Sequence, residues 1–484
     1  MGGVEKDLEE RLLQKGRDQD KRSETLPLTW GALIEELKRL GFLAGPMVAV
    51  TLSQSLLQVI SMVMVGLLGD ELALYSTAIA IFVSGVTGFS LLSGMASALE
   101  TLCGQAYGAE QYRELGVQTY TAIFSMILVC LPLTLLWTHI GKLLILIGQD
   151  PQISHEAGKF TIWLVPALFG YATLQPLLRF FQAQSLAMPM LICSGATLAF
   201  HIALCWALVF KSGLGNLGAA LAIGISYWLN VILLGLYMNY SPACANTRVP
   251  ISMELFQGIG EFFHFAVPSA AMFCLEWWSF GLFMLLSGLL PNPQLETSLL
   301  SVCLATISTL YAIPYGLGAA ASTRISNELG AGNPEAARVA LFAALFLAVI
   351  ETSIVSTTIL ASRPFLGYNF CNNREIVDYV TAMAPLISLS IIPDSLRGVL
   401  SGIARGSGWQ HIGACVNLGA FYLCGLPVSA FLGFWVQFRG RELWIFIQTG
   451  SFVQTVLLSI ITSCTNWEKQ ASKARERIFA GDFQ

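Results

Sequence analysis

Charged residues are scarce in this chain: 12% of its 484 residues are Asp, Glu, Lys or Arg. An average soluble protein carries about 25%. Hydrophobic residues make up 55%, and the mean hydropathy is +0.65, so most of the chain cannot face water. The length alone would suggest about three soluble domains, but the composition excludes that interpretation. No basic stripe is present, so we expect no nucleic-acid partner.

The usual signs of catalysis, metal binding and secretion are also missing. No metal-ligand cluster, nucleophile triad or phosphate-binding loop occurs at a plausible depth, so we predict no enzyme, no metal and no cofactor. The eleven cysteines are odd in number and lie mostly in apolar runs, where they act as small hydrophobic residues. The charged N-terminus has no apolar core of the signal-peptide type.

Long apolar runs dominate what remains. A bilayer is crossed by about 20 apolar residues, and runs of this kind can be drawn twelve times with short loops between them. We therefore predict an all-α integral membrane protein with twelve transmembrane helices, whose partner is the lipid bilayer. The predicted runs are 42–68, 72–99, 117–138, 161–183, 187–210, 215–238, 262–290, 297–323, 339–361, 376–403, 411–436 and 443–465.

The distribution of Lys and Arg predicts the orientation, because cytosolic loops carry an excess of both. The two tails are rich in them, and the even-numbered loops on the same side add a further set. Both termini are therefore predicted to be cytosolic. The loop residues used for this prediction are Arg113, Arg248, Arg324, Arg338 and Arg405.

The two halves of the chain resemble each other. Aligning Pro46 with Pro268 places Gln54 on Glu276, and a similar shift places Gln175 on Asp394. We predict a parallel internal repeat of two six-helix lobes, with a cavity between them. The predicted parts are a cytosolic tail with an interfacial helix (1–41), an N-lobe (42–239), a cytosolic linker (240–261), a C-lobe (262–465) and a cytosolic tail (466–484).

Acidic residues inside the second half are the main functional candidates. A charged side chain at bilayer depth costs about 2.5–3.5 kcal/mol, and such residues are usually functional. Glu276 has no cation within one helical turn, and Trp277 and Trp278 crowd it, which favours its protonated form and suits a proton carrier. Asp394 has Arg397 three residues later, so either a cavity role or an ion pair on one helix face explains it.

Further polar residues are expected to support this site. Ser308, Tyr311 and Asn417, together with Arg397, are candidates for a polar cavity wall. For Glu351 we favour a structural hydrogen-bond network with the neighbouring hydroxyls of Thr352, Ser353 and Ser356. The N-lobe counterparts Gln54 and Gln175 carry no charge, so ionisable chemistry is expected in the second lobe. Helix bending is expected at Pro46, Pro268, Pro314 and Pro393.

Four motifs carry a resemblance to a known family: ASTRISNELGAGNPEAARVA, CLEWWSFG, GSGWQHIGACVNLGAFYLCGLP and GNLGAALAIGISYW. They resemble the multidrug and toxic compound extrusion (MATE) family in its plant DETOXIFICATION-type branch, over about residues 30 to 465. The resemblance implies a two-lobe carrier driven by a cation gradient, with Glu276 and Asp394 exchanging protons and contacting cationic solutes. Glu442 and Phe446 depart from the glycines that plant members tend to carry.

We therefore expect a monomeric antiporter that exports organic cations, xenobiotics or plant metabolites from the cytosol in exchange for protons. Its energy source is a proton gradient, and its location is the plasma or the vacuolar membrane. Sodium coupling is an alternative, because two carboxylates, Asn417 and backbone carbonyls could supply the oxygens. A flippase for lipid-linked substrates would need a strongly basic cavity, whereas the buried charges expected here are mostly acidic.

Overall fold

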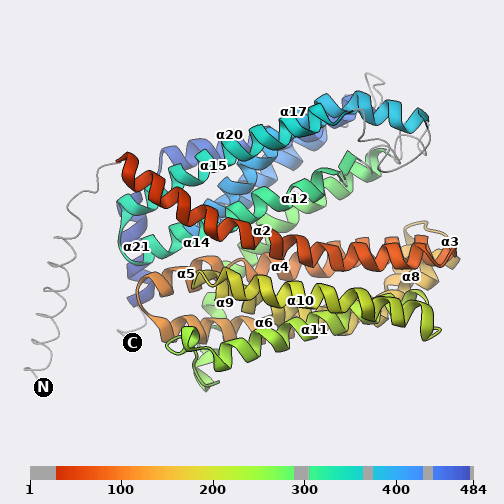
Figure 1. The fold of residues 1–484 in the computed structure, drawn as a ribbon, viewed down its shortest axis with the longest axis horizontal. Coiled ribbons are helices and arrows are strands. Elements are labelled where there is room, and N and C mark those ends of the chain that lie inside the picture. Colours follow the sequence, from red (N-terminus) through yellow and green to blue (C-terminus); the bar gives the residue numbers. More distant parts are fainter. Residues whose placement is uncertain (1–28, 288–302, 305, 364–373, 429–439, 480–484) are drawn as a thin grey trace, which may run out of the picture.

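The computed structural model describes residues 29–287, 303–304, 306–363, 374–428 and 440–479, and their regular secondary structure is helical throughout (Figure 1). This confirms the predicted all-α fold. The N-terminal half contains α2 (Trp30–Gly66), α3 (Glu71–Ser84), η1 (Gly85–Phe89), α4 (Ser90–Ala96), α5 (Leu99–Gly108), α6 (Tyr112–Thr138), α7 (Ile140–Leu146), α8 (Pro151–Trp163), α9 (Val165–Ala183), α10 (Ala187–Trp206), η2 (Ala207–Lys211) and α11 (Asn216–Tyr240). The C-terminal half contains η3 (Pro242–Cys244), η4 (Met253–Phe256), α12 (Ile259–Ser287), α14 (Ala312–Gly330), α15 (Pro334–Ala361), α17 (Arg374–Ser407), α18 (Gln410–Asn417), η6 (Leu418–Gly425), α20 (Gly440–Ser463) and α21 (Trp467–Phe479).

The predicted membrane spans coincide with these helices. In the described part, eight helices are long and apolar enough to cross a membrane, and a ninth span results if α8 and α9, bent by 48° at their junction, are counted as one. The three remaining predicted runs fall on α12, α14 and α20. Each predicted run therefore has a helical counterpart, which agrees with the prediction of twelve spans.

The helices form two lobes that meet over part of their length (Figure 1). One large cluster of buried apolar side chains joins α3 to α11 and also includes Phe262 and Phe265 of α12, and two further clusters join helices of the C-terminal half. Helix α2 belongs to both lobes: Leu40 and Leu43 pack in a C-lobe cluster, and Leu57 and Val65 pack in the N-lobe cluster. The helix is continuous from Trp30, so it has no break at the predicted boundary 41/42.

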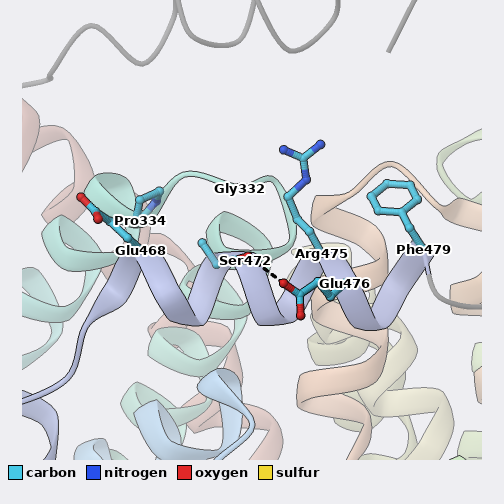
Figure 2. Close-up of a pocket in the computed structure, with 8 residues that line it drawn as sticks. Gly332, Pro334, Glu468, Ser472, Arg475, Glu476 and Phe479 are labelled. Carbon is cyan, nitrogen blue, oxygen red and sulfur yellow. Dashed lines mark hydrogen bonds between the residues drawn. The ribbon is translucent and has the colours of Figure 1, made fainter. Parts of the chain in front are cut away.

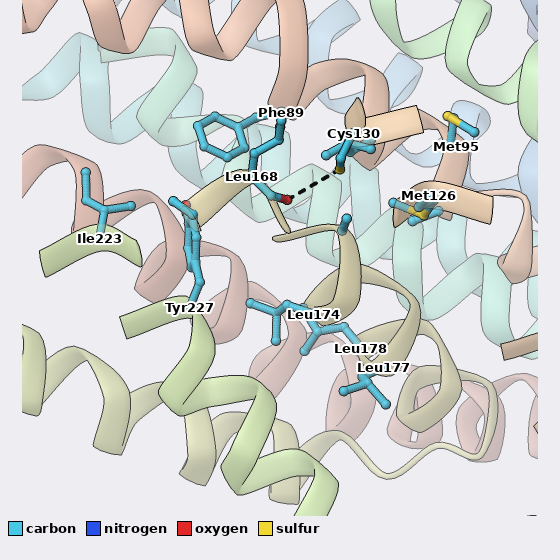
Figure 3. Close-up of a cluster of buried hydrophobic side chains, with 14 of the residues drawn as sticks. Phe89, Met95, Met126, Cys130, Leu168, Leu174, Leu177, Leu178, Ile223 and Tyr227 are labelled. Carbon is cyan, nitrogen blue, oxygen red and sulfur yellow. Dashed lines mark hydrogen bonds between the residues drawn. The ribbon is translucent and has the colours of Figure 1, made fainter. Parts of the chain in front are cut away.

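The N-lobe core is built from aromatic and aliphatic side chains of neighbouring helices (Figure 3). Phe89 lies edge-on to Tyr171 at 5.0 Å, and Tyr171 in turn packs against Tyr227 at 5.4 Å between ring centroids. The core also encloses His201, whose ring nitrogens lie within hydrogen-bond distance of Ser61 (3.2 Å) and Ser226 (2.8 Å). These contacts join α2, α10 and α11 within one lobe.

Small residues let helices approach closely where large side chains would separate them. A Cβ atom at Gly402 on α17 would lie 2.2 Å from the Gly318 carbonyl oxygen on α14. A Cβ atom at Gly108 on α5 would lie 1.9 Å from the Asn327 carbonyl oxygen, also on α14. The first contact lies within the C-lobe, and the second joins the two lobes. The glycine runs therefore serve close helix packing.

The described chain begins and ends at the same end of the molecule, where α2 starts and α21 lies (Figure 1). We call this the α21 end. Helices α14 and α17 both run toward it, since Gly332 lies next to Arg475 and Gly408 next to Arg477. Arg477 also donates to Gln105 Oε1 on α5 at 2.8 Å, and its burial lowers the pKa of the guanidinium. Helix α21 therefore touches both lobes.

The predicted bending points lie within helices that continue past them. Pro46, Pro268 and Pro393 are interior to α2, α12 and α17, and Pro314 lies in the first turn of α14. The measured bend, at the junction of α8 and α9, is next to Pro166. Bending at the four predicted prolines stays a prediction.

Candidate functional site

Glu276 and Asp394 share one cation in the C-lobe. Arg397 pairs with Glu276 Oε1 through Nη1 and donates from Nε to Asp394 Oδ1 at 2.9 Å. All three side chains are buried, with exposed fractions of 7% for Glu276, 4% for Asp394 and 2% for Arg397. Two carboxylates and one guanidinium give the cluster a formal charge of minus one when both acids are ionised. We call these three residues the acid cluster.

Two further features describe the surroundings of the acid cluster. The Tyr311 hydroxyl donates to Glu276 Oε1 at 3.0 Å, and the guanidinium of Arg397 stacks on the Tyr311 ring at 4.7 Å. Asp394 Oδ2 is buried without a hydrogen-bond partner. Glu276 Oε1 is thus engaged by two donors, whereas Asp394 keeps an oxygen that can accept a proton.

This arrangement changes the predicted surroundings of Glu276. The sequence suggested an acid crowded by Trp277 and Trp278 with no cation within one turn, but Arg397, on another helix, lies against it. Both tryptophans are partly exposed, at 38% and 41%. Trp278 donates to the Val86 carbonyl oxygen at 3.1 Å and so joins α12 to η1 in the other lobe.

A cavity of about 230 Å³ lies between the lobes. Its N-lobe wall is rich in amides and its C-lobe wall in aromatic rings. The residues that line it include Gln54, Gln58, Gln175, Arg179, Gln182, Tyr171, Tyr227, Phe273, Trp277, Ser308, Tyr311 and Tyr315. Glu276 lies behind this wall, beside a small void that Trp277, Tyr311 and Tyr315 also border. The acid cluster is therefore separated from the main cavity by one layer of aromatic side chains.

The two predicted N-lobe counterparts also meet in space. Gln175 Nε2 donates to Gln54 Oε1 at 3.2 Å, and both side chains line the cavity. Glu276 and Asp394, at the matching positions of the C-lobe, are joined through Arg397 instead. The position that matches Arg397 is Leu178, three residues after Gln175. Each repeat thus brings the same two helix positions together, with a charged link in only one lobe.

The supporting residues divide into two groups. Ser308 and Tyr311 line the cavity. Asn417 is fully buried and donates to the Met272 carbonyl oxygen at 2.7 Å, so it joins α18 to α12.

The expected network around Glu351 is wrong in its partners. Ser353 donates to the Val349 carbonyl oxygen, Ser356 donates to the Ser388 carbonyl oxygen, and Thr352 Oγ1 is buried without a hydrogen-bond partner. The side chains of Glu442 and Phe446 lie outside the described part.

Sequence reasoning missed a second charged cluster. Glu100 on α5 pairs with Arg179 on α9 and with Arg405 on α17, each at 2.9 Å. Arg405 was assigned to a loop and used for the orientation, as was Arg324, but both are helical, and Arg324 pairs with Glu36 at 2.6 Å. The available signal was Arg179 within the predicted run 161–183 and Glu100 directly after the predicted run 72–99. The N-lobe therefore has buried charges of its own.

A groove of about 680 Å³ lies beside α21 at the surface (Figure 2). It is lined by Gly332, Pro334 and residues of α21, among which Ser472 donates to Glu476 Oε1 at 3.0 Å. Arg475 points away from α21 in this view. None of the predicted site residues lines this groove, so the cavity between the lobes is the better candidate site. Among the described residues, no group of three or more His, Cys, Asp or Glu could hold a metal ion.

Comparison with known proteins agrees with this architecture. The family model described as MatE matches twice, over residues 46–207 and 268–431. The two matches begin at Pro46 and Pro268, the residues that align the predicted repeat. Because one model matches both halves, the internal repeat and the two-lobe organisation are confirmed.

Individual relatives are similar over almost the whole chain. Protein DETOXIFICATION 12 of Arabidopsis thaliana is 59% identical over 456 residues, covering 93% of this chain and 95% of that protein. Protein DETOXIFICATION 14 of the same plant is 60% identical over 451 residues, covering 93% of each. The crystal structure of the eukaryotic MATE transporter AtDTX14 has a TM-score of 0.89 at 60% identity, covering 92% of this chain and 100% of that one. An outward-facing structure of a multidrug resistance MATE family transporter, 14% identical, shares the fold with a TM-score of 0.78, covering 93% of this chain and 97% of that one.

Proposed function

Since this chain belongs to the MatE family of membrane transporters, we propose that it is a proton-coupled antiporter that exports organic cations, xenobiotics or plant metabolites from the cytosol. It works as a monomer without a cofactor, in the plasma or the vacuolar membrane. Both termini are cytosolic, so the α21 end faces the cytosol. The observation that carries the proposal is the acid cluster, in which two buried carboxylates share one arginine beside the cavity.

Charge balance explains how the acid cluster couples a proton to a solute. With both acids ionised, the cluster carries one excess negative charge, and either a proton or a nearby cation neutralises this charge. Binding of one therefore disfavours binding of the other, and this coupling is reciprocal. Asp394 Oδ2, buried without a hydrogen-bond partner, is a place for the proton. The aromatic layer of Trp277 and Tyr311 offers ring faces to an organic cation in the cavity.

Transport then follows two steps. A proton that enters from the far side neutralises the acid cluster and releases a cationic solute there. When the cavity opens to the cytosol, the proton leaves, and the ionised cluster attracts the next solute. Because a solute and a proton compete for the same excess charge, entry of the proton drives export of the solute.

Two rival functions make different predictions. Sodium prefers several converging oxygens, but Arg397 already occupies the space between the two carboxylates, and Asn417 is committed to a backbone carbonyl. A flippase for lipid-linked phosphates would need a strongly basic cavity, whereas the described residues that line this cavity are amides, aromatic rings, hydroxyls and aliphatic side chains, with Arg179 as the one charged residue among them. Both observations favour proton-coupled export of organic solutes.

The test is uptake of the fluorescent cation ethidium by inside-out proteoliposomes, with a proton gradient or a sodium gradient imposed separately. We expect the proton gradient alone to drive the wild type, and Glu276→Gln to abolish gradient-driven uptake. Gln54→Ala is the matched control at the equivalent N-lobe position, and it should keep the response to the gradient. Uptake driven by sodium alone, or normal proton-driven uptake by Glu276→Gln, would contradict the proposal.

A further inference from the structure

Glu100 is a buried acid that the proton-coupling scheme does not use. Its side chain is fully enclosed, and it forms ion pairs with one arginine from each lobe. Arg179 comes from the same lobe as Glu100, whereas Arg405 comes from α17 in the other lobe. Breaking a buried ion pair strongly destabilises the protein if one of the two charges is left without a partner. The two arginines are therefore not equivalent for any motion between the lobes.

Contacts around Glu100 form a barrier between the cavity and the α21 end. Thr101 donates to the Arg405 carbonyl oxygen, and Gln410 Nε2 lies 2.5 Å from Thr101 Oγ1. On the cavity side, Arg179 donates to the Tyr315 hydroxyl at 2.9 Å, and both residues line the cavity. Nearer the α21 end, Asn327 donates to the Ala183 carbonyl oxygen at 3.1 Å. These contacts cross between the lobes, and they close the cavity toward α21.

Opening the cavity at this end requires Arg405 to leave Glu100. Arg179 moves with Glu100, because α5 and α9 pack in the same lobe. Glu100 thus keeps one cation after the lobes separate, so the break does not leave it as an unpaired buried charge. The Glu100–Arg405 contact can therefore form and break repeatedly, because Arg179 stays paired with Glu100 in both states.

We propose that the Glu100–Arg405 pair holds the α21 end of the transport pathway closed, and that Arg405 is a positioning residue for alternating access. Arg397 and Arg405 lie on the same helix, about 12 Å apart along its axis. A shift of α17 when the acid cluster changes its charge is thereby transmitted to the barrier. This inference rests on the alternating access proposed above, but its test needs neither a solute nor a proton gradient.

The experiment measures how fast a maleimide reacts with single cysteines in detergent-solubilised protein, in a chain whose own cysteines are replaced and which still transports. Asn327→Cys reports on the barrier, and Ser125→Cys, fully buried on α6 within the N-lobe, reports on general loosening. Glu100→Gln should raise the rate at Asn327→Cys at least about tenfold, because a buried ion pair that favours the closed state is lost. The rate at Ser125→Cys should stay as low as without the substitution at Glu100. This difference separates opening of the barrier from general loosening.

Three comparisons make the result decisive. Glu100→Asp keeps the charge and should restore wild-type rates at both positions. Asn230→Ala removes a buried hydrogen bond to Ser194 within the N-lobe and should leave both rates unchanged. If Glu100→Gln does not fold, Arg405→Gln against Arg405→Lys gives the same contrast. Unchanged rates, or rates that rise together at both cysteines, would overturn the proposal. Loss of coupling in Glu276→Gln is measured separately, so the two proposals can fail independently.

Discussion

The two lobes place the same pair of helix positions side by side but join them differently. In the N-lobe, Gln54 and Gln175 make one direct hydrogen bond of 3.2 Å. In the C-lobe, Glu276 and Asp394 are linked through Arg397. The repeat thus preserved the geometry of a polar contact at the cavity and placed a titratable version of it in one lobe only.

Under the proposed function, this difference separates solute binding from energy coupling. Amides can bind a solute through hydrogen bonds, but they neither gain nor lose a proton near neutral pH. Two acids and one arginine have an excess charge that a proton cancels. Under the proposed function, the amides of the N-lobe wall contact the solute, and the acid cluster behind the C-lobe wall couples its binding to a proton. The following four changes test that division, from the largest expected effect to the smallest.

Arg397→Met should have the largest effect, because it leaves two buried carboxylates without their cation. We expect a loss of about 3–5 kcal/mol in stability near neutral pH. Thermal unfolding of the purified protein in detergent measures it, and stability should return as the pH falls, because protonation removes the unpaired charges. Unchanged stability at neutral pH would mean that the acids are already protonated, and the charge difference between the lobes would disappear.

Tyr311→Phe should follow, because it removes the hydrogen bond to the Glu276 carboxylate. A hydrogen bond to a charged group is worth about 1.5–3 kcal/mol. Made in the Glu276→Gln background, the same change should cost much less, and a double-mutant cycle on unfolding temperatures measures the difference. Tyr315→Phe, one turn away, is the control, since Tyr315 contacts Arg179 instead. An equal cost of Tyr311→Phe in both backgrounds would show that the tyrosine does not act through Glu276.

Gln175→Ala should change solute binding modestly and leave coupling intact. A neutral hydrogen bond contributes about 0.5–1.5 kcal/mol, so the KM for ethidium should rise roughly twofold to tenfold. The ratio of uptake with and without a proton gradient should equal that of the wild type. If this ratio falls toward one, Gln175 takes part in coupling, and the proposed division between solute binding in the N-lobe and coupling in the C-lobe is wrong.

Arg338→Gln should have the smallest effect. Arg338 pairs with Glu335 at 3.3 Å on one face of α15, and both side chains are about half exposed. Exposed pairs of this kind contribute about 0–1 kcal/mol, so stability and transport should match the wild type within that margin. A loss comparable to that of Arg397→Met would show that charge removal as such, rather than burial, governs the larger effects.

Much of this architecture could be predicted from the sequence. Apolar runs reveal membrane helices because the bilayer requires them, and the alignment of Pro46 with Pro268 correctly located the repeat. The partner of Glu276 could not be predicted, because Arg397 is 121 residues away and only helix packing brings it close. The Glu100–Arg405 pair was missed for the same reason. Charge counting placed Arg405 in a loop, although the helix continues to Ser407.

The most direct test of the central claim is the number of protons released when a solute binds. Purified protein in weakly buffered detergent solution is mixed with ethidium, and a pH-sensitive dye reports the protons. The account predicts release of about one proton per bound cation by the wild type and by Gln54→Ala. Glu276→Gln, whose remaining Asp394–Arg397 pair is neutral, should release none. Equal release by Glu276→Gln, or none by the wild type, would contradict coupling through the acid cluster.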